Sequence, residues 1–133
     1  MTRVSHAAAS SQVWTEGLDG GCTPFLTGAG GFLQSVVFGT SGMRLLSDRL
    51  TFNPPPPSAT GANATALSLK GVHWRGARFD QRVAADSVVY TLTQAPRSGG
   101  VSLVAADGTE QALRVGTPVV LKRDGVHSMV PTK

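Results

Sequence analysis

Residues 13–21, VWTEGLDGG, hold the side chains of this 133-residue chain that are best suited to perform chemistry together. Glu16 and Asp19 lie in an apparent loop, with Trp14 before them and two glycines after. An indole beside a carboxylate is a common feature of sugar sites, because the ring offers a flat apolar surface and the carboxylate serves as an acid or base. Composition alone favours the simpler interpretation, an exposed acidic loop.

A glycine-rich turn, TGAGG at residues 27–31, precedes a short apolar run. A phosphate-binding Walker loop requires Gly-x-x-x-x-Gly-Lys-Ser/Thr, and no Lys follows these glycines. A dinucleotide fingerprint requires a third glycine where this chain has Leu33, and no strand is predicted before Gly28. The turn therefore does not predict a nucleotide site.

Residues able to hold a metal ion or to form a nucleophilic triad are few and dispersed. His6, His73 and His127 lack zinc-ligand spacing, and Cys22 is the single cysteine. The nucleophile elbow Gly-x-Ser-x-Gly does not occur. We therefore expect no metal, no cofactor and no internal disulfide.

A basic string between residues 70 and 82 contains Lys70, His73, Trp74, Arg75, Arg78 and Arg82. On alternating strands with a turn between them, these side chains are divided between two faces and a loop tip. No RNP or KH motif accompanies them. The pattern favours a solvated sheet face, so no nucleic-acid partner is expected.

Composition indicates a folded protein, with 41% hydrophobic residues, 15% charged residues and a formal net charge of +4. The first segment, MTRVSHAAASSQ, lacks the apolar region of roughly 7–15 residues that a secretory signal needs. No run approaches the ~18 apolar residues of a membrane span. With one cysteine, these features favour a soluble cytoplasmic protein without a membrane partner.

From Met43 to about Arg123 the pattern alternates between strand and turn. Apolar residues from Leu67 to Trp74 fall near period two, with a slip at Gly71 that indicates a bulge. A tight turn at 75–76 and a hairpin signal at 107–108 follow the same scheme. Seven or eight short strands predict a mainly β chain whose residues 42–125 form a two-sheet antiparallel β-sandwich, with a tail at 126–133.

A helix is predicted at about 28–38, capped by Thr27 and ended by Gly39. Its apolar positions are Phe32, Leu33, Val36, Val37 and Phe38. They cover nearly the whole circumference of two turns, which is typical of a helix buried on all sides. A single sandwich offers no obvious place for such a helix, so the pattern indicates a second domain.

Four blocks occur in order: VWTE, FLTGAGGFLQSVVFG, GMRLLSDRLTFNPPPP and LSLKGVHWRGARFD. Together they resemble the C-terminal end of family 65 glycoside hydrolases, within them the animal acid-trehalase-like branch. The resemblance covers about residues 13–95. It implies a large (α/α)6 barrel that carries the active site and a C-terminal β-sandwich beside it. Residues 1–41 would then be a remnant of the barrel with its last helix, and the chain a C-terminal fragment.

The resemblance also implies an activity, the inverting hydrolysis of α-linked glucose from glucosyl-galactosyl-hydroxylysine of collagen. It places Glu16 at the position of the general base, with Trp14 as a candidate sugar-binding residue. The general acid and most of the sugar pocket would lie upstream, so the chain alone is expected to be inactive and to need the rest of the barrel as its partner. Two alternatives remain open: a family 65 disaccharide phosphorylase, or a non-catalytic sandwich that binds carbohydrate or protein.

Overall fold

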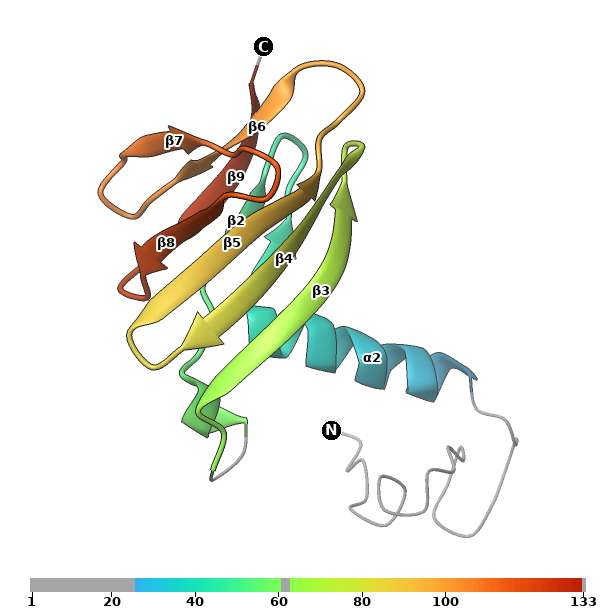
Figure 1. The fold of residues 1–133 in the computed structure, drawn as a ribbon. Coiled ribbons are helices and arrows are strands. Elements are labelled where there is room, and N and C mark those ends of the chain that lie inside the picture. Colours follow the sequence, from blue (N-terminus) through green and yellow to red (C-terminus); the bar gives the residue numbers. More distant parts are fainter. Residues whose placement is uncertain (1–25, 61–62, 133) are drawn as a thin grey trace, which may run out of the picture. The chain divides into compact units, whose positions relative to one another are not determined.

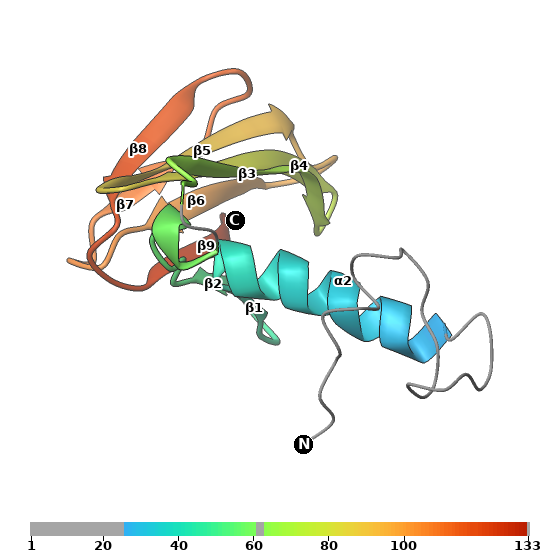
Figure 2. The same ribbon diagram turned by 90° about the horizontal axis from the view of Figure 1, so that it is seen from below.

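The computed structural model describes residues 26–60 and 63–132. The chain divides into two compact units, Met1–Val36 and Val37–Lys133, with the boundary inside helix α2 (Leu26–Ser41). Figure 1 and Figure 2 show that the second unit consists mainly of two β-sheets packed face to face. The prediction of a mainly β chain with a helix before a two-sheet antiparallel sandwich is confirmed.

The five-stranded sheet has the order β1-β2-β9-β6-β7. Its strands are β1 (Met43–Leu45), β2 (Leu50–Phe52), β6 (Gly100–Val104), β7 (Glu110–Ala112) and β9 (His127–Thr132). The four-stranded sheet has the order β3-β4-β5-β8. Its strands are β3 (Ala66–Trp74), β4 (Ala77–Ala84), β5 (Ser87–Gln94) and β8 (Pro118–Lys122). A 3-10 helix, η1 (Pro57–Ala59), follows the proline run.

Local sequence signals explain the β3–β4 hairpin. Arg75 and Gly76 have φ of 48° and 82°, as a two-residue type I′ turn demands. The pairing register shifts between Leu69 and Val72, and Gly71 there has a φ of 71°. The bulge predicted at Gly71 is therefore confirmed.

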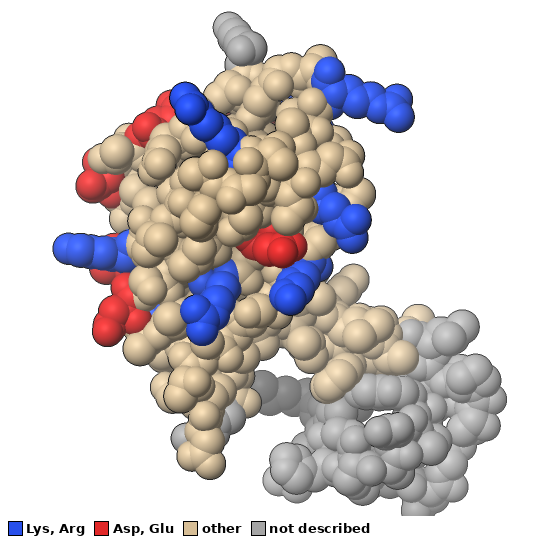
Figure 3. All heavy atoms as spheres, viewed as in Figure 1, with Lys and Arg blue, Asp and Glu red and all other residues tan. Residues whose placement is uncertain are grey.

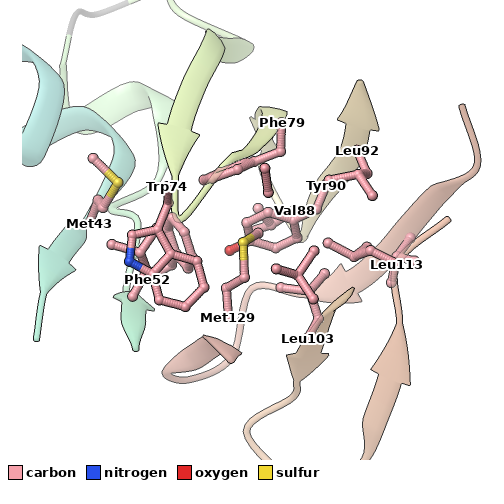
Figure 4. Close-up of a cluster of buried hydrophobic side chains, with 14 of the residues drawn as sticks. Met43, Phe52, Trp74, Phe79, Val88, Tyr90, Leu92, Leu103, Leu113 and Met129 are labelled. Carbon is pink, nitrogen blue, oxygen red and sulfur yellow. The ribbon is translucent and has the colours of Figure 1, made fainter. Parts of the chain in front are cut away.

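The core lies between the two sheets. Side chains of β4 and β5 alternate, so that Phe79 and Tyr90 point inward and are fully buried. Figure 4 shows them with Phe52, Met129 and Leu103 of the opposite sheet. The Phe52 ring stands edge-on to Phe79 at 5.9 Å and to Tyr90 at 5.1 Å between centroids. Such aromatic pairs contribute about 0.5–1.5 kcal/mol beyond the apolar area that they bury.

The predicted helix is present, but it begins at Leu26 and continues past Gly39 to Ser41. Its apolar side chains are not all buried in this chain: Phe32 is 42% exposed, Leu33 62% and Val36 41%. The last two apolar positions, Val37 and Phe38, are half-buried against the sandwich core. The helix therefore presents apolar surface at its middle and packs at its C-terminal end.

The sequence-based boundaries need one correction, because residues 126–133 do not form the expected tail. His127–Thr132 form β9, which lies between β2 and β6, and Met129 pairs with Leu50 on one side and Leu103 on the other. The sequence does not indicate this strand, because Pro131 argues against an inner strand and because a histidine, His127, occupies one of its inward positions.

Candidate functional site

The two residues with a predicted role in sugar chemistry, Trp14 and Glu16, lie outside the described residues, as do Asp19 and Cys22. Their roles therefore stay predictions. The nearest described element is α2, which begins shortly after them in the chain. The contacts that fix the C-terminal end of this helix within the sandwich unit can be followed in detail.

Helix α2 ends in a set of hydrogen bonds that satisfy its last carbonyl groups. The Ser41 hydroxyl donates to the Val37 carbonyl and accepts the Met43 N–H at 3.1 Å. The Arg44 guanidinium donates to the Phe38 carbonyl at 3.2 Å and to the Met43 carbonyl at 2.7 Å. Free C-terminal carbonyls and the helix dipole both favour a cation here.

Gly42 turns the chain from α2 into β1. Its φ of 63° is left-handed, the conformation that glycine adopts most readily after a helix. Its carbonyl accepts the Asn53 N–H at 3.0 Å, and an added Cβ would lie only 2.1 Å from the Asn53 carbonyl carbon. Only glycine fits this close approach of two backbones without a shift.

A chain of polar groups runs through the core from the end of α2 to β9. The Gln81 amide nitrogen donates to the Ser41 carbonyl at 3.2 Å and to the Tyr90 hydroxyl at 3.4 Å. Nδ1 of His127 lies 3.3 Å from that hydroxyl, and Nε2 lies 2.8 Å from the Lys122 carbonyl. A carbonyl only accepts, so Nε2 carries the proton and Nδ1 accepts from Tyr90.

Burial controls the titration of this network. It raises the pKa of the Tyr90 hydroxyl, against the opposing effect of the Gln81 hydrogen bond. It also lowers the pKa of His127, which the Lys122 carbonyl and the Asp124 charge partly counteract. Both groups are therefore kept neutral, Tyr90 as a donor and His127 in one tautomer.

Gln81 has one polar atom without a partner among the described residues, the buried Oε1. The amide cannot be reversed, because Oε1 would then face the Ser41 carbonyl. Gln81 is 1% exposed, as is His127, so both side chains are buried. The arrangement joins α2, β4, β5 and β9.

The basic string is divided as the sequence predicts. Trp74 points inward and is 7% exposed. The guanidinium carbon of Arg75, at the hairpin tip, lies 5.5 Å from the centre of the Trp74 ring, and the Arg75 side chain donates to the Ser47 carbonyl. Lys70, Arg78 and Arg82 are exposed on the outer face of the four-stranded sheet. Figure 3 looks onto this face and shows basic side chains around an acidic one. A hollow of about 360 Å³ on this face is lined by Lys70, Gly71, Arg78, Asp80, Thr93 and Gln94.

A second hollow, of about 500 Å³, lies beside β8 and the β6–β7 loop. Two of its polar residues are already engaged: both ring nitrogens of His127 are bonded, and Asp107 accepts the Thr109 N–H, which lowers the pKa of Asp107. In residues 26–60 and 63–132, no group of three or more His, Cys, Asp or Glu could hold a metal ion. No helix within these same ranges has the length and apolar character needed to cross a membrane.

Comparison with known proteins relates the chain to a segment of larger enzymes. It is 36% identical over 119 residues to protein-glucosylgalactosylhydroxylysine glucosidase of Danio rerio, which covers 87% of this chain and 18% of that protein. The protein of the same name in Mus musculus is 37% identical over 83 residues, 62% of this chain and 11% of its own length. The protein of the same name in Gallus gallus is 35% identical over 93 residues, which are 69% of this chain and 13% of that protein. No family model and no solved structure matches the chain.

Proposed function

We propose that this chain is the C-terminal part of a longer inverting α-glucosidase that removes glucose from glucosyl-galactosyl-hydroxylysine of collagen. The observation that carries the proposal is the 36% identity over 119 residues to a glucosidase named for this disaccharide unit. The proposal is also supported by the family 65 blocks from VWTE to LSLKGVHWRGARFD, which occur in the expected order.

In the proposed reaction Glu16 acts as the general base. Its carboxylate takes a proton from water, whose oxygen attacks the anomeric carbon of glucose as the bond to galactose breaks. A carboxylic acid elsewhere in the barrel, about 6.5–9.5 Å away, protonates the leaving oxygen. Trp14 offers its ring to the sugar face. Without that acid and the barrel pocket, the chain alone is expected to release no glucose.

The exposed middle of α2 supports this arrangement. Leu33 is 62% exposed, and an apolar helix face of this kind gains free energy when neighbouring helices cover it. At its C-terminal end, hydrogen bonds of Ser41 and Arg44 hold the helix to the sandwich unit. We propose that α2 is the last helix of the barrel and that its C-terminal end joins the barrel to the sandwich.

The test is replacement of Glu16 by Gln in the longer protein, with glucose release from glucosyl-galactosyl-hydroxylysine as the assay. Loss of a general base costs about 10²–10⁴-fold in turnover. Asp19→Asn, which removes a carboxylate from the same loop, is the matched control and should leave turnover near normal. Normal turnover of the Glu16 variant would exclude the assigned role. Turnover that requires phosphate and yields glucose 1-phosphate would identify the enzyme as a phosphorylase instead.

A non-catalytic sandwich is the second candidate, and one observation favours it. Residues 37–133 form a compact unit whose two sheets enclose a shared aromatic core. If the sandwich acts alone, the 133-residue chain should be monomeric and should retain glycans on an array. Aggregation that is relieved only by the rest of the barrel would count against this candidate.

A further inference from the structure

Two strand irregularities meet on the outer face of the four-stranded sheet. On β3, Lys70 and Gly71 together lie opposite Asp80, because the register shifts between Leu69 and Val72. On β5, Thr93 is an extra residue, because Arg78 pairs with Gln94 and Phe79 with Leu92. The strand between them, β4, is thus flanked by a bulge on each side at residues 78–80. Bulges are enriched beside functional sites, where they redirect side chains.

The 360 Å³ hollow lies at these two bulges. The Gly71 N–H donates to Asp80 Oδ1 at 2.7 Å, and the Arg78 guanidinium lies above Gly71, where an added Cβ would be 2.9 Å from Nη2. The Thr93 hydroxyl donates to the Arg78 carbonyl at 3.0 Å. The two bulges therefore bring a guanidinium and a carboxylate into the same hollow.

The charged groups of the hollow are not satisfied by one another. In the described residues the one ion pair joins Arg49 and Asp48, so neither Lys70 nor Arg78 is paired with Asp80. No described group bonds to Asp80 Oδ2 or to the side-chain nitrogens of Lys70, Arg78 and Gln94. The hollow thus offers two cations, an amide and a carboxylate oxygen to a ligand.

We propose that this hollow binds an acidic sugar residue of a glycan, through its carboxylate or sulfate group and its ring hydroxyls. Arg78 suits a planar or tetrahedral oxyanion because its N–H groups form a fork, and Lys70 adds a second positive charge. Asp80 only accepts hydrogen bonds, so it requires a ligand that also carries donors, which sugar hydroxyls supply. The volume suits a small ligand, since small-molecule sites begin at about 300 Å³.

Other anionic partners fit less well. Among the described residues that line the hollow, none is aromatic, so none offers a ring on which a nucleobase could stack. An acidic peptide would be attracted by Lys70 and Arg78 as an acidic sugar is, but its acidic side chains offer no hydroxyl donor to Asp80 Oδ2. The proposal does not depend on the proposed hydrolase activity, because none of the observations behind it involves Glu16.

Binding can be tested by titration calorimetry of the whole 133-residue chain with three tetrasaccharides: hyaluronan, chondroitin 4-sulfate and neutral chitotetraose. We expect both acidic sugars to bind in 150 mM NaCl and the neutral one not to bind. Hyaluronan carries carboxylates alone and chondroitin 4-sulfate carries carboxylates and sulfates, so tighter binding of the second shows that sulfate contributes. Arg78→Gln should weaken binding about tenfold or more, as expected for loss of a charged hydrogen bond. Arg114→Gln makes the same charge change at an exposed residue that does not line the hollow and should bind normally.

Asp80→Asn separates sugar recognition from simple charge attraction. Asparagine keeps an oxygen for the Gly71 N–H but replaces Oδ2 by a donor. Sugar binding should therefore weaken, whereas binding of a polyglutamate peptide, a pure polyanion, should strengthen. Lys70→Gln serves as the second cation variant if Arg78→Gln does not fold. Equal weakening in Arg114→Gln, tighter sugar binding by Asp80→Asn, or a preference for polyglutamate would each overturn the proposal.

Discussion

Replacement of Gly42 by Ala should destabilise the sandwich unit far more than its small size suggests. Gly42 has a φ of 63°, and its added Cβ would lie 2.1 Å from both the carbon and the oxygen of the Asn53 carbonyl. The same Cβ would lie 2.4 Å from the Pro54 nitrogen. These are backbone atoms at the start of a stiff proline run, so they cannot rotate away as a side chain would.

The expected cost has two parts. Left-handed φ costs a residue with a Cβ roughly 1–2 kcal/mol. Forcing the Asn53 backbone apart adds an overpacking term of about 1–3 kcal/mol. Together they give about 2–5 kcal/mol, against a total stability for ordinary domains of about 5–15 kcal/mol. Loss of the bond from Asn53 N–H to the Gly42 carbonyl would take the cost toward the upper end of that range.

Variants at two other glycines measure the backbone cost separately from the overpacking cost. The assay is unfolding by urea, followed by circular dichroism. Gly108 has a φ of 85° with nothing within 4 Å, so Gly108→Ala should cost the backbone part alone, roughly 1–2 kcal/mol. Gly39 is exposed in α2 with nothing within 4 Å, and Gly39→Ala should stabilise by about 0.5–1 kcal/mol. The change in the unfolded chain is the same in all three variants. If Gly42→Ala were no worse than Gly108→Ala, the contact with Asn53 would not constrain the fold.

Three further predictions concern the core. Tyr90→Phe should lower the free energy of unfolding at pH 7 by about 1–2 kcal/mol, because Gln81 and His127 Nδ1 each lose a partner. Phe52→Ala should lower it by about 3–5 kcal/mol in the same assay, since the ring is fully buried. The pKa of His127 is lowered below 6.5 on folding, so the unfolded chain binds the proton more readily. The free energy of unfolding should therefore fall as the pH drops from 6.5 to the folded pKa of His127 in wild type and His73→Gln, but not over this range in His127→Gln.

The part of the fold that could be predicted from sequence is the part built from neighbours in the chain. The hairpins of β3, β4 and β5 are joined by short turns, and Gly71 and Gly76 mark the bulge and the turn by their type alone. Alternation then assigns Phe79 and Tyr90 to the core face. Period two and turn chemistry are sufficient here because each strand pairs with its successor.

Features that depend on distant pairing could not be predicted in this way. The strand β9 is inserted between β2 and β6, and its neighbour β2 lies more than 70 residues earlier, as the pairing of Leu50 with Met129 shows. The bulge at Thr93 appears only when β4 and β5 are aligned. Gln81 and His127 look like surface residues in a sequence, because only the fold brings Ser41 and Tyr90 to them.

Side chains of β4 alternate between the core and the outer face of the sheet, so the two faces have different roles. Phe79 and Gln81 point inward, where Gln81 holds the end of α2 through the Ser41 carbonyl. Arg78 and Asp80 point outward into the hollow that we propose for an acidic sugar. Catalysis by Glu16 and sugar binding at Asp80 therefore depend on different segments, and either proposal can fail while the other stands. If both hold, the strand that anchors α2 also presents the sugar site, so a glycan bound there would be tethered to the enzyme whose proposed substrate is itself a glycan.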